Sequence, residues 1–173
     1  MELKDILRTV PDFPKPGINF IDITPLLATP QLFSTTVDRL AAFTQQQQTD
    51  LILAAEARGY LFGAAVAYRT RLPLAIVRKP GKLPHATIAH TYDLEYGTDT
   101  LELHEDAVTK GQRVMIVDDL LATGGTVEAC AKLVEQLGGV VAGCAFVIEL
   151  SFLAGREKLK DYEVLSLIDY DSE

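Results

Sequence analysis

One stretch in the middle of the chain restricts the possible folds more than any other. Four apolar residues, 114–117, run into the adjacent acids Asp118 and Asp119, and a loop of small and hydroxyl residues then leads into a helical pattern. The apolar run is short and rich in β-branched residues, which is typical of a buried strand in a parallel sheet. We therefore expect a strand–loop–helix unit whose loop lies at the carboxyl end of the strand, where open α/β sheets bind ligands.

The loop after these acids has the composition of an anion site. Gly124 and Gly125 permit positive φ angles and close backbone approach, so successive N–H groups can converge on an anion. Thr123 and Thr126 add hydroxyl donors, and the following helix directs its positive N-terminus to the same place. The loop lacks the lysine of a Walker motif and the spacing of a dinucleotide-binding fingerprint. The pattern therefore favours a phosphorylated ribose over a nucleoside triphosphate.

Asp118 and Asp119 indicate a second role for the same loop. Carboxylates repel a phosphate, but they suit sugar hydroxyls or a nearby metal ion. Because neighbouring strand residues face opposite sides, both acids can serve one ligand only if the strand breaks up there. The alternative is an ordinary glycine-rich turn, which leaves the cost of burying two adjacent carboxylates unexplained.

Size and composition indicate one globular domain over residues 1–173. We find no apolar run long enough for a membrane span and no signal peptide, so we expect a cytoplasmic protein with no membrane partner. Cys130 and Cys144 lie in apolar patterns without a partner at metal-ligand spacing, which is typical of buried thiols in a reducing compartment. The net charge of −8 disfavours binding to nucleic acid.

Basic residues are concentrated in one segment of this acidic chain. Residues 57–92 contain Lys and Arg residues but no Asp or Glu. A basic segment in an acidic protein concentrates anions around it. Arg69 and Arg71 fit a solvated helix C-terminus, where cations are favourable. Arg78, Lys79 and Lys82 follow a strand pattern directly and are the stronger candidates for binding an anion.

Short apolar runs alternate with helical patterns along most of the chain. The expected elements are a helix starting at Pro30, strand 51–55, helix 60–69, strand 74–77, a two-stranded excursion over 86–104, strand 113–117, helix 127–137, and strands 140–148 and 164–168. This alternation predicts an α/β fold with a mostly parallel sheet flanked by helices. Polar loops after three of the strands would then meet at one edge of the sheet.

Several stretches resemble the adenine phosphoribosyltransferases, a branch of the type I phosphoribosyltransferase family, over nearly the full length. The matching stretches are 16–20, 23–27, 56–63, 78–84, 92–99 and 117–126. The resemblance implies a single phosphoribosyltransferase domain with a small flexible hood built from about 11–27 and 80–105. It also implies transfer of the 5-phosphoribosyl group from phosphoribosyl pyrophosphate to adenine, which gives AMP and pyrophosphate in purine salvage.

The resemblance further implies a role for each part of the site. The phosphoribosyl group would contact Asp118, Asp119, Ala122, Thr123, Gly124, Gly125 and Thr126. Pyrophosphate would contact Arg58, Gly59, Arg78, Lys79 and Lys82. Adenine would lie against Ile18, Asn19 and Phe20, with Phe20 as the stacking face. Glu95, Tyr96 and Arg58 would be catalytic, with Glu95 as acid–base partner of the purine ring. The Mg²⁺ cofactor would be held mainly by substrate oxygens and water, with no direct protein ligand.

Other functions remain open from the sequence. An enzyme for hypoxanthine, guanine or xanthine usually reads the 6-oxo group with a Lys, whereas Glu149 and Leu150 follow the strand pattern that ends at 148. A regulator that only binds phosphoribosyl pyrophosphate normally adds a DNA-binding segment, and we find no basic helix for one. Two of the site residues also have a structural alternative. Phe20 could be a buried core residue instead of a stacking face, and Glu95 could be a solvent-exposed hairpin residue instead of an acid–base group. The family implies a homodimer, which is the default for soluble oligomers.

Overall fold

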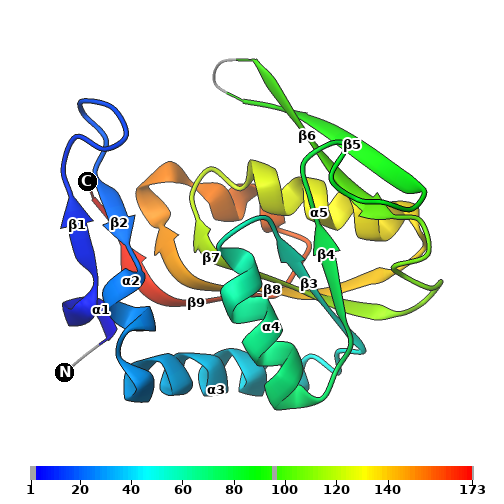
Figure 1. Cartoon of the computed structure of the whole chain (residues 1–173), viewed down its shortest axis with the longest axis horizontal. Coiled ribbons are helices and arrows are strands. Elements are labelled where there is room, and N and C mark those ends of the chain that lie inside the picture. The colour runs from blue at the N-terminus through cyan, green and yellow to red at the C-terminus, as the bar shows by residue number, and fades with distance from the viewer. Residues whose placement is uncertain (1–2, 95–96, 173) are drawn as a thin grey trace.

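A computed structural model describes residues 3–94 and 97–172. Its centre is a parallel sheet in the order β4-β3-β7-β8-β9 (Figure 1). The strands of this sheet are β3 Leu51–Ala55, β4 Leu74–Val77, β7 Arg113–Leu121, β8 Val140–Leu150 and β9 Val164–Tyr170. In the β3–β7 pairing, Ala54 lies opposite Val117. The carboxyl ends of these two strands are therefore neighbours.

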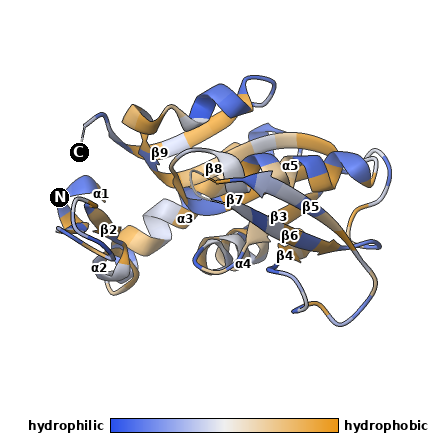
Figure 2. Cartoon of the chain, turned by 90° about the horizontal axis from the view of Figure 1, so that it is seen from above, coloured by the Kyte–Doolittle hydropathy of each residue, from blue (hydrophilic) through white to orange (hydrophobic). Residues whose placement is uncertain are grey.

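Helices cover both faces of the sheet. α3 Pro30–Gln46 and α4 Gly59–Thr70 pack on one face, and α5 Gly125–Gln136 packs on the other. Successive strand residues point to opposite faces, so Ile116 joins the α5 core while Met115 joins the α3–α4 core. Figure 2 shows apolar colouring along the sheet and polar colouring in the outer turns. β3 is apolar throughout, and β7 is apolar from 114 to 117, because both faces of the sheet are covered there.

Two smaller units extend from the sheet. The N-terminal unit contains α1 Leu3–Ile6, β1 Arg8–Val10, β2 Phe20–Asp22 and α2 Thr24–Leu27, and its two strands pair antiparallel. The second unit is the antiparallel hairpin of β5 Thr87–Asp93 and β6 Thr98–His104. In Figure 1 the N-terminal unit lies at the left and the hairpin at the upper right.

The structure confirms the predicted fold class and most of the elements. β3 and β4 have the predicted bounds, and the excursion over 86–104 is the β5–β6 hairpin. The predicted strand 113–117 was too short, because β7 keeps its pairing with β8 as far as Leu121. β1 and the 3-10 helices η1 Ser151–Leu153 and η2 Gly155–Leu159 were not predicted, since such short segments have no periodicity to detect. Across the described ranges, no helix combines the length and apolarity that a membrane crossing needs.

Candidate active site

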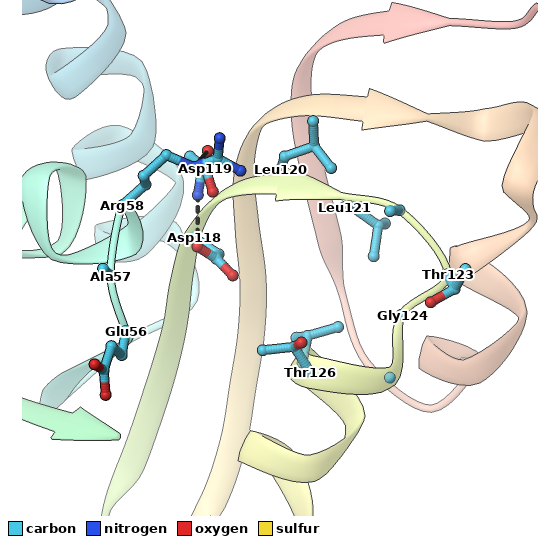
Figure 3. A pocket seen from close by; sticks show the side chains of 13 residues that line it. Glu56, Ala57, Arg58, Asp118, Asp119, Leu120, Leu121, Thr123, Gly124 and Thr126 are labelled. Carbon is cyan, nitrogen blue, oxygen red and sulfur yellow. Dashed lines mark hydrogen bonds and ion pairs between the residues drawn. The ribbon is translucent and has the colours of Figure 1, made fainter. Parts of the chain in front are cut away.

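A cavity of about 370 Å³ lies where β3 and β7 end (Figure 3). One wall is the turn between β3 and α4, and the other is the end of β7 with the loop into α5. The lining residues are Glu56, Ala57, Arg58 and all residues from 118 to 127. This volume is typical of a small-molecule site. Two of the three polar loops that the sequence placed at this edge therefore form one cavity.

The loop from β7 to α5 has the backbone of an anion site. Gly124 is left-handed, with φ +84°, and α5 begins at the next residue. A Cβ at Gly124 would lie 2.7 Å from the carbonyl oxygen of Gly155, so this position requires glycine for two reasons. The first-turn N–H groups of α5 have no partner within the helix, and they lie next to Thr123 and Thr126 in the cavity wall. The loop can thus hold an anion with backbone and hydroxyl donors.

Asp118 and Asp119 both line the cavity from β7. The backbone N–H of Asp119 donates to Asp118 Oδ1 at 2.9 Å. Asp119 is buried, and its Oδ2 atom lies 2.8 Å from Arg58 Nε. This contact has the distance of an ion pair but not the angle of a hydrogen bond, so Oδ2 has no hydrogen-bond partner in the described part of the chain. β7 runs through these acids to Leu121 without breaking up, yet both acids line the cavity. The expectation that the strand must break up there for both to face one site is therefore wrong.

The two acids differ in their electrostatic environment. Burial raises the pKa of Asp118 well above its ordinary value, and the neighbouring Asp119 carboxylate raises it further. An acid with a raised pKa in the folded state contributes stability below its unfolded pKa and loses it as pH rises through the folded value. The burial of Asp118 therefore makes the unliganded protein less stable at neutral pH than in acid, as far as this group is concerned.

Replacing Asp118 by Asn should accordingly raise the free energy of unfolding at neutral pH, by about 1–2 kcal/mol or roughly 2–6 °C in Tm. The gain should shrink as pH falls toward 3.8, the ordinary pKa of the carboxyl. Thermal unfolding of both proteins from about pH 4 to 8 measures this difference. Asp38→Asn removes an exposed carboxylate that pairs with Arg69, and it serves as a control that should not stabilise. A less stable Asp118→Asn protein at neutral pH would contradict the expectation.

Arg58 links the acids to the N-terminal unit. Its guanidinium carbon lies 5.1 Å from the centre of the Phe20 ring, in a cation–π contact. Phe20 is only partly buried, and Ile18 and Asn19 beside it are exposed. Phe20 is therefore not a core residue. Its ring is held at the edge of the cavity by a side chain that lines the cavity.

The basic residues after β4 do not line the cavity themselves. They contact Glu56, whose carboxylate does line it. Lys82 Nζ lies 2.5 Å from one oxygen of Glu56, and Arg78 Nε lies 3.5 Å from the other. Lys79 donates its backbone N–H to Glu56 and pairs through Nζ with Asp99. The hydrogen bond from Lys82 lowers the pKa of Glu56. Glu56 lines the cavity, so these cations lie at its margin and are partly neutralised.

The remaining predicted residues have different positions. Gly59 begins α4, and a Cβ there would lie 2.6 Å from Asp118 Oδ1, so the missing side chain lets α4 approach the acids. Ala122 lines the cavity with the rest of its loop. Glu95 and Tyr96 lie outside the described residues.

Sequence reasoning missed three residues that shape this site: Glu56, Tyr92 and Gly155. The Tyr92 hydroxyl lies 3.3 Å from Thr126 Oγ1, and a Cβ at Gly125 would lie 3.2 Å from the Tyr92 ring. The hairpin therefore touches the start of α5. Glu56 and Tyr92 lie in two of the stretches that resemble the family, 56–63 and 92–99. That resemblance was the sequence signal that could have identified them as site residues. Gly155 carries no comparable signal, because it reaches the loop from a distant 3-10 helix.

This arrangement suits a ligand with anionic ends and a sugar between them. The loop supplies donors for one anion, and Arg58 with the basic residues at the margin supplies charge for another. The carboxylates of Asp118 and Asp119 lie between them as acceptors for hydroxyl groups.

The chain is similar to phosphoribosyltransferases over nearly its whole length. The family model of the phosphoribosyl transferase domain matches residues 26–172. The adenine phosphoribosyltransferase of Acidobacterium capsulatum is 58% identical over 168 residues, which are 97% of this chain and 93% of the relative.

Solved structures agree with this similarity. The crystal structure of adenine phosphoribosyltransferase from Thermoanaerobacter pseudethanolicus has a TM-score of 0.94 at 55% identity and covers 97% of this chain and 98% of that chain. The enzyme from Saccharomyces cerevisiae, complexed with an imino-altritol bisphosphate and adenine, has a TM-score of 0.90 at 40% identity and covers 95% and 96%. The chain therefore belongs to the phosphoribosyltransferase family and, within it, to the adenine phosphoribosyltransferases.

Proposed function

We propose that this cavity carries out the reaction of the adenine phosphoribosyltransferases, in which adenine and phosphoribosyl pyrophosphate give AMP and pyrophosphate. The observation that carries the proposal is one cavity formed by an anion-binding loop, two adjacent acids and Arg58, with an aromatic ring against Arg58. Family membership supports the same reaction. The bond from C1′ of the ribose to pyrophosphate breaks, and a bond from C1′ to a ring nitrogen of adenine forms.

The phosphoribosyl group binds along β7 and the loop after it. The amides of the 122–126 loop and the hydroxyls of Thr123 and Thr126 hold the 5′-phosphate. Asp118 and Asp119 accept hydrogen bonds from the ribose hydroxyls. Their negative charge stabilises the positive charge that grows on the ribose ring as its bond to pyrophosphate breaks. The raised pKa of Asp118 supports this role, because a carboxylate destabilised by burial gains more from a positive charge that develops beside it on the ribose ring.

Pyrophosphate leaves toward Arg58 and Gly59, with Arg78, Lys79 and Lys82 at the margin. Mg²⁺ fits this place, because the buried Asp119 Oδ2 atom lacks a hydrogen bond among the described residues and carboxylate oxygens suit this ion. We assign most of the coordination of Mg²⁺ to substrate oxygens and water, with Asp118 and Asp119 close by. When bound, the ion supplies charge neutralisation for the leaving pyrophosphate.

Adenine stacks on Phe20, beside Ile18 and Asn19. The proposed hood consists of about 11–27 and 80–105. β2, α2 and the β5–β6 hairpin fall within these ranges, whereas α1 and β1 precede them. Glu95 is proposed as the acid–base partner of the purine, with Tyr96 beside it. Such a hood would exclude water from a cationic ribose that water would otherwise attack. The relative from Saccharomyces cerevisiae, which was solved with adenine, supports an adenine slot in this fold.

We also propose that the protein is a cytoplasmic homodimer. Leu61, Tyr68 and Leu74 are exposed apolar residues on α4 and at the start of β4, and Tyr68 is 88% exposed. Exposed apolar residues on neighbouring elements support a contact with a second copy.

The test is to mix the protein with Mg²⁺ and phosphoribosyl pyrophosphate, and to add adenine, hypoxanthine, guanine or xanthine separately. Chromatography of the products should show AMP from adenine and no nucleotide from the other bases. Nucleotide from a 6-oxopurine would retain the phosphoribosyl site but contradict the adenine slot. Binding of phosphoribosyl pyrophosphate without any product would instead support a regulator.

A further inference from the structure

An ion pair between a buried carboxylate and a half-exposed arginine lies behind the 122–124 loop. Glu149 on β8 is 4% exposed, and Arg156 on η2 donates from Nε and Nη2 to both of its carboxylate oxygens at 2.7–2.9 Å. The Ser166 hydroxyl on β9 donates to Glu149 Oε2 at 2.6 Å and accepts from Arg156 Nη2 at 2.9 Å. A bidentate pair with a third partner is a rigid arrangement. It fixes η2 to the last two strands of the sheet.

The residue before Arg156 touches the loop. A Cβ at Gly155 would clash with the carbonyl oxygen of Ala122, and a Cβ at Gly124 would lie 2.7 Å from the carbonyl oxygen of Gly155. Because neither glycine has a Cβ, the two backbones pack directly against each other, and no flexible side chain lies between them to absorb a displacement. Ala154 also has a left-handed conformation, with φ +54°, which holds the chain in a sharp turn before Gly155. A movement of η2 must therefore move the loop.

We propose that Glu149, Arg156 and Ser166 are positioning residues that hold the 5′-phosphate loop in its binding conformation. Arg156 is neutralised by Glu149, so it acts through the position of Gly155 and not by attracting the phosphate itself. The identity of the ligand rests on the proposed function.

Replacing Arg156 by Met keeps an unbranched, flexible side chain but removes the guanidinium and with it the pair. We expect the Kd for ribose 5-phosphate, measured by calorimetry, to rise about tenfold or more, because a displacement of about 1 Å can cost up to 10²-fold. The KM for phosphoribosyl pyrophosphate should rise in parallel, while the KM for adenine should change less than about twofold. Arg156→Lys keeps the charge without the bidentate geometry and should give an intermediate loss.

Arg113→Met is the matched control. Arg113 donates to the carbonyls of Gln47 and Gln48 at the opposite end of β7, so the variant loses an arginine's hydrogen bonds far from the loop. It should lose stability without losing affinity for ribose 5-phosphate. An equal loss of affinity in both variants, or no loss in a folded Arg156→Met protein, overturns the proposal. If Arg156→Met does not fold, Glu149→Gln weakens the pair with a smaller change and decides by the same measurement.

Ribose 5-phosphate binding does not require turnover of adenine, so the two proposals can fail separately. A wild-type protein that binds ribose 5-phosphate but forms no AMP contradicts the proposed function. The Arg156 variants still test the positioning role in that case. A wild-type protein that does not bind ribose 5-phosphate overturns both.

Discussion

Replacing Arg58 by Ala is expected to lower kcat/KM for phosphoribosyl pyrophosphate by about 10²–10³-fold, or roughly 3–4 kcal/mol of transition-state stabilisation. Among the described residues that line the cavity, Arg58 is the only cation, so no other lining side chain replaces its charge as pyrophosphate leaves. Arg78 and Lys82 already pair with Glu56 at the margin. Steady-state kinetics with each substrate varied in turn measures the effect.

Arg69→Ala is the matched control for this substitution. Arg69 lies on α4, whose first residue follows Arg58, and its Nε pairs with Asp38 at 2.6 Å on the surface. Removing this exposed pair should cost less than about 1 kcal/mol of stability and leave the kinetics unchanged. The Arg58 variant must show a two-state unfolding transition before its kinetics are interpreted. Equal activity of the Arg58 and Arg69 variants would refute the pyrophosphate role of Arg58.

The order of strands and helices was predictable because the central strands are buried on both faces. Such strands have short, uniformly apolar sequences, as in 51–55, and glycine and proline mark their ends. The glycine-rich loop between β7 and α5 was predictable for a related reason. Gly124 and Gly125 next to hydroxyl residues have few structural roles besides close backbone approach. Local sequence therefore determined both the fold class and the loop.

Contacts between distant segments could not be predicted in the same way. The pairing of Lys82 with Glu56 and the approach of Gly155 to Ala122 depend on how separate turns pack together. β7 also continues past Asp118, because its pairing with β8 stabilises the strand where the local sequence suggested that it ends. Pairing across a sheet is a property of two segments, so neither segment shows it alone.

Replacing Gly124 by Ala should have the second large effect. At φ +84° the alanine is strained, and its Cβ would lie 2.7 Å from the carbonyl oxygen of Gly155. Because the neighbouring atom is backbone, the loop must move. We expect the free energy of unfolding to fall by about 2 kcal/mol and the KM for phosphoribosyl pyrophosphate to rise roughly 10–10²-fold. Chemical denaturation and steady-state kinetics measure the two effects on the same protein.

The Gly111→Ala variant separates the effect of backbone strain from the effect of the close contact with Gly155. Gly111 has nearly the same dihedral, φ +81°, but a Cβ there would meet nothing within 4 Å, and the residue lies before β7, at the end of that strand opposite the cavity. This variant should lose about 1 kcal/mol from backbone strain alone and keep its affinity for phosphoribosyl pyrophosphate. If both variants lose equal stability and neither loses affinity, the contact between Gly124 and Gly155 does not shape the loop. A selective loss in Gly124→Ala would show that the loop needs its close backbone packing as well as its left-handed turn.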